Sequence, residues 1–142
     1  SIQLGAYINL VCDENEQTAL SLGKLIAGMV AHFAGLKHAP TEHLPPRLRA
    51  VAEHLQSQYD MARHAQEAGS HLALIDEDFV DWFSICGPPQ KCIERLEPLI
   101  NMGLEHIYQL GGTPVAHPHG ARQIAMVEQA QLFATDVIPH FR

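Results

Sequence analysis

Residues 2–12 of this chain have the sequence IQLGAYINLVC, a nearly continuous apolar run that is rich in strand-forming residues. A run of this kind is typical of a strand that is buried on both faces of a parallel sheet. Gly5 weakens the front of the strand, which we expect to begin near Ala6. Residues 105–110, EHIYQL, alternate between polar and apolar side chains. This alternation predicts a second strand.

Amphipathic helices are predicted between and after these two strands. Their approximate ranges are 14–35, 46–68, 77–83, 88–103 and 121–137. Asp13 is expected to cap the first helix, with Glu16 three residues later as in a capping box, and Asp76 is expected to cap the third. Pro98 lies inside the fourth helix and should kink or shorten it, and Pro139 should end the last helix.

The order of the elements is strand, two helices, a short helix, a helix, a strand and a helix. Strands followed by helices predict a helix-rich α/β fold with parallel strands. Two strands are too few for a stable parallel sheet, and residues 84–87 are expected only as a short apolar segment. Gly23 and Gly28 lower the propensity of the first helix and allow a neighbour to pack closely. We therefore expect residues 1–142 to be a single domain or fragment that belongs to something larger or pairs with another copy.

The charge balance excludes two classes of partner. Lysine and arginine number 9 against 16 aspartates and glutamates, a net charge of −7, and the sequence has no basic patch. Binding to nucleic acid or to an anionic membrane surface needs such a patch, so neither is expected. No apolar run approaches the roughly 20 residues of a membrane span, and no signal peptide is recognisable. We expect a cytoplasmic protein.

Cysteine and histidine residues give little indication of a metal site. Cys12, Cys86 and Cys92 are odd in number and form no C-x-x-C motif, which favours reduced, buried thiols. The chain has 10 histidines, but only His117 and His119 stand close together, in a loop, and no H-E-x-x-H motif occurs. We expect no bound metal and keep a metal-binding helical protein as a minor alternative.

Acidic, glycine-rich and aromatic clusters each have a structural interpretation beside a functional one. Two acidic clusters lie at predicted helix starts, where the helix dipole favours negative charge, so capping explains them better than a catalytic acid or base. Their members are Asp13, Glu14 and Glu16, and Asp76, Glu77, Asp78 and Asp81. Residues 111–113 form either a plain turn, which is favoured, or a backbone anion site. Trp82, Phe79 and Phe83 are expected in the core rather than on a stacking surface.

Residues 76–110 resemble the C-terminal region of luciferase-like monooxygenases. An acidic short helix is followed by an F-x-I-x-G segment at residues 83–87, FSICG, and by a helix start at residues 88–96, PPQKCIERL. That helix ends in MGLEHI at residues 102–107 and leads into the last strand. Residues 5–36 resemble the preceding strand and helix of the family. Residues 59–64 resemble the branch that includes F420-dependent methylenetetrahydromethanopterin reductase.

This resemblance implies the C-terminal part of a (β/α)8 barrel, a TIM-type fold with FMN or coenzyme F420 bound at the carboxyl ends of its strands. A full barrel needs about 250 residues, so the chain would correspond only to the last strands and their helices. The loops after these strands would form the cofactor site, with no catalytic residue assigned. The residues expected to bind the cofactor are Cys12, Asp13, Gln109, Gly111, Gly112 and Thr113.

The resemblance therefore implies a flavin- or F420-dependent oxidoreductase fragment that acts on a small organic substrate by hydride transfer or oxygen activation. The expected partners are the small-molecule substrate and either further copies of the chain or the missing N-terminal part of the barrel. The alternative is a non-catalytic truncated module that self-associates through its half-barrel face, because exposed strand edges and apolar stripes favour association.

Overall fold

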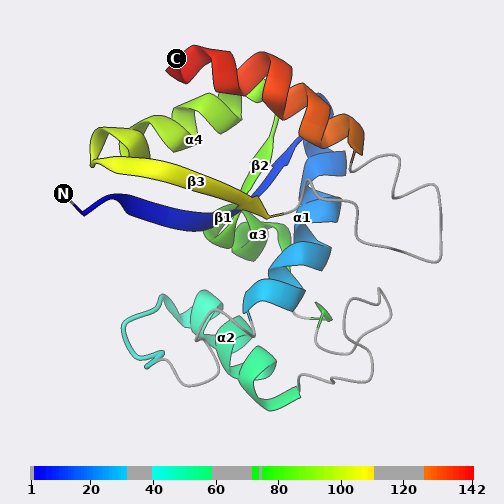
Figure 1. Ribbon diagram of the computed structural model, residues 1–142. Helices are drawn as coiled ribbons and strands as arrows, with labels where there is room; N and C mark the ends of the chain where they lie inside the picture. The colour runs from blue at the N-terminus through cyan, green and yellow to red at the C-terminus, as the bar shows by residue number, and fades with distance from the viewer. Residues whose placement is uncertain (1, 32–39, 59–71, 74, 111–126) are drawn as a thin grey trace.

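A computed structural model describes residues 2–31, 40–58, 72, 73, 75–110 and 127–142 of the chain. These residues form three strands and a set of helices around them (Figure 1). In chain order the elements are β1 (Leu4–Cys12), α1 (Glu16–Ala31), α2 (Pro46–Gln58), α3 (Glu77–Phe83), β2 (Ile85–Gly87), α4 (Pro89–Asn101) and β3 (Leu104–Leu110). A C-terminal helical segment from residue 127 ends in a π turn (Phe133–Val137) and a 3₁₀ turn (Ile138–Phe141). None of the described helices combines the length and the apolar character that crossing a membrane requires.

The three strands are parallel and lie in the order β2-β1-β3. β2 is the short apolar segment that the sequence did not identify as a strand, because three residues are too short to show a period. It pairs only with the end of β1, from Leu10 opposite Ile85 to Cys12 opposite Gly87. β3 pairs along the front of β1 and ends where Asn9 lies opposite Leu110.

Helices cover both faces of the carboxyl half of the sheet. Alternate residues of β1 point to opposite faces, as the pleat requires. Val11 packs with α1, α2 and α3, whereas Leu10 and Cys12 pack with α4 and the C-terminal helical segment. The front of β1 extends beyond these helices (Figure 1) and is exposed or half-buried up to Ile8. The expectation of a strand buried on both faces therefore holds only for its last four residues.

The sheet order differs from that of consecutive barrel strands. In a (β/α)8 barrel each strand lies beside the next one along the chain, but β2 and β3 lie on opposite sides of β1. The described strands confirm a helix-rich, parallel α/β fold and do not confirm a barrel. In open α/β sheets generally, ligands bind in a crevice at the carboxyl ends of neighbouring strands whose connections leave toward opposite sides.

Two predicted helix ends need correction. α1 begins at Glu16, and the residue before it, Asn15, accepts a hydrogen bond from the Thr18 N–H at 2.9 Å through its side chain. Asn15, not Asp13, is therefore the N-cap of α1. Pro139 does not end the last helical segment, because it lies in the first turn of the 3₁₀ helix, where its missing N–H leaves no bond unmade.

Other predicted ends are confirmed. Asp76 caps α3 by accepting a hydrogen bond from the Phe79 N–H at 2.9 Å. The expectation that Pro98 would shorten its helix is wrong, because α4 spans Pro98 and continues to Asn101. The end of α4 before Gly103 agrees with the sequence. Gly103 follows with a φ of 98°, a left-handed conformation that glycine adopts without strain. The first thirteen residues predicted for the second helix form α2, and its predicted end lies outside the described residues.

Candidate functional site

The candidate site is the carboxyl edge of the sheet between β1 and β3. The last described β1–β3 pair is Asn9 opposite Leu110, and β1 runs on to Cys12. β1 therefore reaches three residues beyond this pair at the edge where the crevice of an open α/β sheet lies. Ligands of open α/β sheets bind in such a crevice because loops and helix starts converge there. This is also the edge at which the sequence places the cofactor-binding residues.

Asp13 directly follows β1 and is held by three neighbours. Its backbone N–H donates to the Gly87 carbonyl at 3.0 Å, which continues the line of β1 beside β2. Its Oδ1 accepts a hydrogen bond from the Asn15 N–H at 2.8 Å. Its Oδ2 accepts a hydrogen bond from Nε2 of Gln129. The carboxylate is therefore fixed at the mouth of the crevice by the chain on either side.

Gln129 is a residue of this site that the sequence analysis missed. It lies on the C-terminal helical segment, 116 positions from Asp13 in the sequence, and only 4% of its surface is exposed. Its amide nitrogen donates to Asp13, but its Oε1 has no hydrogen-bond partner among the described residues. A buried amide oxygen without a partner costs about 1–3 kcal/mol. The sequence gives no sign that a glutamine on this helix is buried and contacts Asp13, because glutamine is common on exposed helix faces.

Gln109 lies on the β3 side of the crevice. Its Nε2 donates to the Leu10 carbonyl at 3.3 Å, a group of β1 beyond the last β1–β3 pair. The side chain thus bridges β3 and β1 next to the last described backbone pair. Gly111, Gly112 and Thr113, which the sequence places next to it, lie outside the described residues.

Cys12 lies below the edge with its side chain fully buried against α4. A hydrogen bond from its thiol to Cys92, together with burial, raises the pKa of Cys12 far above its ordinary value. The same hydrogen bond lowers the pKa of Cys92, although burial opposes it. Cys92 in turn donates to the Gly87 carbonyl at 3.5 Å. The two thiols couple the end of β1 to the start of α4.

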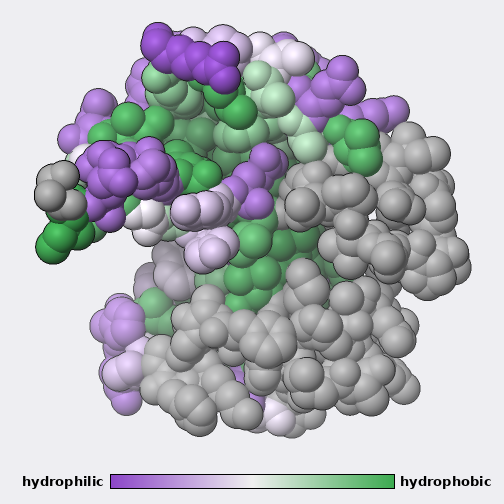
Figure 2. Space-filling model, in the orientation of Figure 1, coloured by the Kyte–Doolittle hydropathy of each residue, from purple (hydrophilic) through white to green (hydrophobic). Residues whose placement is uncertain are grey.

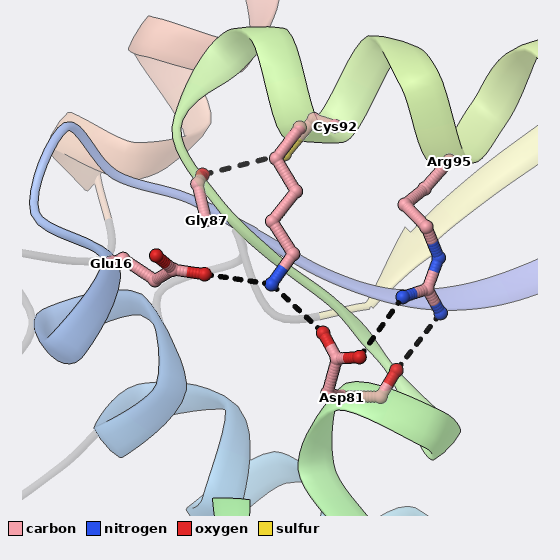
Figure 3. A network of polar contacts seen from close by, with 6 residues as sticks. Glu16, Asp81, Gly87, Cys92 and Arg95 are labelled. Carbon is pink, nitrogen blue, oxygen red and sulfur yellow. Dashed lines mark hydrogen bonds and ion pairs between the residues drawn. The ribbon is translucent and has the colours of Figure 1, made fainter. Parts of the chain in front are cut away.

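A second polar cluster joins α1, α3 and α4 on the outer side of β2 (Figure 3). Lys91 Nζ lies 2.8 Å from a carboxylate oxygen of Glu16 and 2.8 Å from one of Asp81. Arg95 donates to the Asp81 carboxylate at 3.3 Å and to the Asp81 carbonyl at 2.9 Å. Partial burial raises the pKa of Asp81, but the hydrogen bonds and charges of Lys91 and Arg95 outweigh it and hold this pKa below its ordinary value. Both cations are neutralised, so the cluster connects helices and leaves no free charge for catalysis.

The predicted acidic clusters have structural roles in the described residues. Asp76 is a cap, Glu16 and Asp81 are ion-paired, and Glu77 accepts a hydrogen bond from Gln17 at 2.8 Å. No group of three or more histidine, cysteine, aspartate or glutamate side chains suited to a metal occurs within the described ranges. His117 and His119 lie outside those ranges.

The aromatic prediction is right for Phe79 and wrong for Trp82. Phe79 is fully buried in the core between α1 and α3. Trp82 is 44% exposed, because it lies at the rim of the core, three residues after the buried Phe79 on the short helix α3. Its indole contacts both Phe79 and Phe83, at ring centroid distances of 5.7 and 6.2 Å. Trp82 is therefore available at the surface, beside Arg95.

Comparison with known proteins finds similarity to a curated sequence and to a solved structure. Over 99% of its length the chain is 25% identical to the 5,10-methylenetetrahydromethanopterin reductase of Methanopyrus kandleri, and it spans 36% of that protein. The solved structure of the coenzyme F420-dependent tetrahydromethanopterin reductase from Methanopyrus kandleri matches 99% of the chain and 36% of its own, with a TM-score of 0.54 and 24% identity. No protein-family model matches. The chain is thus similar in sequence, at low identity, to about a third of an F420-dependent reductase, and it is similar to the same portion in fold.

Proposed function

We propose that this chain is part of an F420-dependent oxidoreductase that transfers hydride between the cofactor and a small organic substrate. The observation that supports this most is the similarity to the reductase over 99% of the chain. The relatives' names point to F420 and to reduction, so we favour F420 over FMN and hydride transfer over oxygen activation. We also propose that residues 1–142 form one unit that corresponds to the last strands and helices of a (β/α)8 barrel. Further polypeptide would supply the other strands, and β3 would have to leave its place beside β1 to follow β2 in such a barrel.

In this proposal the carboxyl edge of β1 and β3 contributes to the cofactor site. The hydrogen-bond acceptors there suit a flat heterocycle with ring N–H groups. They are the carboxylate oxygens of Asp13 and the Oε1 of Gln129, which has no partner among the described residues. When bound, F420 would supply the hydride, as cofactors generally supply the chemistry in such enzymes. Asp13 and Gln129 would orient the ring, and Gln109 would hold β1 and β3 at the spacing the ring needs. Cys12, Gly111, Gly112 and Thr113 are proposed to shape the site.

A titration of the chain with F420 tests this proposal. We expect a shift of the F420 absorbance band and a higher melting temperature, since a ligand that binds only the folded state stabilises it. FMN serves as the comparison ligand. Gln129→Leu should weaken F420 binding at least about ten-fold, and Glu14→Gln, an exposed neighbour of Asp13, should not. If saturating F420 caused no absorbance shift and no change in melting temperature, a cofactor site in this chain would be refuted. A stronger effect of FMN would refute the choice of cofactor.

A non-catalytic module that self-associates is the second candidate. The observation that favours it is the uncovered front of the sheet, where Leu4, Tyr7 and Tyr108 are 55%, 73% and 54% exposed. Tyr7 and Tyr108 lie side by side on neighbouring strands, with ring centroids 5.0 Å apart. Sedimentation over a range of protein concentrations tests this function. A monomer at all concentrations would exclude it, and a dimer that Tyr7→Ser dissociates would support it.

A further inference from the structure

A second cavity lies away from the carboxyl edge, under the front half of β1. Its volume is about 430 Å³, within the range of small-molecule sites. β1, α3 and α4 form its walls, and Figure 2 shows the surface hollowed beneath the strands that extend from the body of the protein. β2 pairs only with the last three residues of β1, so no described strand covers the same edge of β1 at residues 4–9.

Two buried polar side chains in this cavity have no partner. Asn9 is 7% exposed and Ser84 is 3% exposed, and both line the cavity. Neither Asn9 Oδ1 nor Ser84 Oγ has a hydrogen-bond partner among the described residues, so they do not bond to each other. Buried polar atoms are nearly always hydrogen-bonded, and each exception asks for an explanation. A single water could serve both atoms, but it would fill only a small part of this volume.

The sheet places these two atoms side by side. Because Leu10 lies opposite Ile85, the preceding residues Asn9 and Ser84 are neighbours in the same register. Adjacent strands lie about 4.8 Å apart. By the alternation of the pleat, Asn9 and Ser84 point to the same face as Val11 and Cys86, the face that α1 and α3 cover. The pair therefore offers an acceptor, Oδ1, beside a hydroxyl that can donate.

An aromatic wall faces this polar pair. Trp82 and Phe83 of α3 line the cavity, and Tyr7 lines it from β1. Phe79, fully buried, packs against Trp82 and Phe83 at centroid distances of 5.7 and 5.6 Å and fixes both rings. Aromatic walls with a few placed polar groups favour a flat ring that stacks and is oriented by hydrogen bonds.

The charges around the cavity favour an uncharged ligand. Arg95 lines it, but its guanidinium is already bound to the carboxylate and the carbonyl of Asp81. The adjoining cleft shares Trp82 and Arg95 with the cavity, and four carboxylates and two cations line it. An anionic ligand would therefore meet an excess of negative charge.

We propose that this cavity binds an uncharged planar heterocycle that has an N–H and a C=O on adjacent ring atoms. The ring N–H donates to Asn9 Oδ1, the ring carbonyl accepts from the Ser84 hydroxyl, and the ring stacks between the sheet and Trp82. This site is separate from the carboxyl edge and does not depend on F420 binding there.

The test uses quinazolin-4(3H)-one, a bicyclic lactam, and its 3-methyl derivative, which has the same ring and carbonyl but no N–H. The chain has one tryptophan, so its indole N–H gives one resonance that reports on Trp82. We expect the lactam to shift this resonance with saturation and the 3-methyl derivative to bind at least about ten-fold more weakly, because it leaves the buried acceptor unpaired. No saturable shift, or equal affinities, would overturn the proposal.

Two variants test the polar pair. Ser84→Ala and Asn9→Leu should each weaken lactam binding at least about ten-fold and abolish the preference over the 3-methyl derivative. Both should leave the free protein as stable as before or more stable, since they remove an unpartnered buried polar atom. Ser57→Ala, at an exposed position of α2, is the control and should change nothing. If both variants still bound the lactam more tightly than the 3-methyl derivative, the proposed contacts would be contradicted. The comparison of the two ligands on the unchanged chain remains a test even if a variant fails to fold.

Discussion

Replacing Gly23 with alanine tests how closely α1 packs on the sheet. Gly23 is buried on the face of α1 that lies against β2 and α3. A Cβ at this position would overlap the Sγ of Cys86 and lie 3.0 Å from a methyl carbon of Val80. Both neighbours belong to the core and are almost fully buried, so neither has free space to move into.

The size of the effect follows from two opposing terms. Alanine is favoured over glycine inside a helix by about 1 kcal/mol. Forcing an extra carbon into a packed core costs about 1–3 kcal/mol. We expect overpacking to win, because the overlap is with the short, buried Cys86 side chain. The free energy of unfolding should therefore fall by up to about 2 kcal/mol.

Urea denaturation followed by circular dichroism measures this change. Ser21→Ala, at an exposed position two residues earlier on α1, is the matched control and should raise the stability slightly through helix propensity alone. Adding Cys86→Ala to Gly23→Ala should cost less than the two single changes together, because the removed sulfur makes room for the new methyl group. A Gly23→Ala chain as stable as Ser21→Ala would refute this account of the contact between α1 and β2.

Three further predictions concern the polar contacts and the thiols. Asp81 has a lowered pKa in the folded chain, so its contribution to stability is present above its unfolded pKa of about 3.9 and is lost as the pH falls through the folded value. When the free energy of unfolding is measured at decreasing pH, the Asp81→Asn chain should lose less stability than the unchanged chain. Asn15→Ala should lower the free energy of unfolding by about 1 kcal/mol, as expected for the loss of an N-cap, and an unchanged denaturation midpoint would argue against that role. Burial raises the pKa of Cys86 to about 12. At pH 8 Cys86 of the native chain should therefore react with iodoacetamide far more slowly than a peptide cysteine does, and mass spectrometry after timed labelling measures that rate.

Local signals predicted most of the elements. The acidic residue before α3, the prolines at the start of α4 and the glycine after it act within one or two turns, so the sequence places those helices with little help from the rest of the chain. The same reasoning missed β2, because its three residues become a strand only by pairing with the end of β1. It also assigned the cap of α1 to Asp13, although Asn15 lies directly before the first turn and accepts from the Thr18 N–H of the helix, whereas Asp13 accepts from the N–H of Asn15 itself.

Some residues of the candidate site were expected before the structure was known, and others were not. The family resemblance implied that residues in the loops after the two longer strands would form a cofactor site at the carboxyl ends of those strands. It gave no indication of Gln129, nor of Asn9 and Ser84 as an unpartnered pair, since each depends on what packs around it.

The sequence by itself determined the apolar strands, the helices between them and the parallel α/β class, because period and capping are local properties of the chain. Only the tertiary structure decided the order β2-β1-β3, the turning of Trp82 to the surface and the contact of Gln129 with Asp13. The physical reason is that strand order and the partners of buried polar groups depend on contacts between residues up to 116 positions apart, which no local pattern encodes.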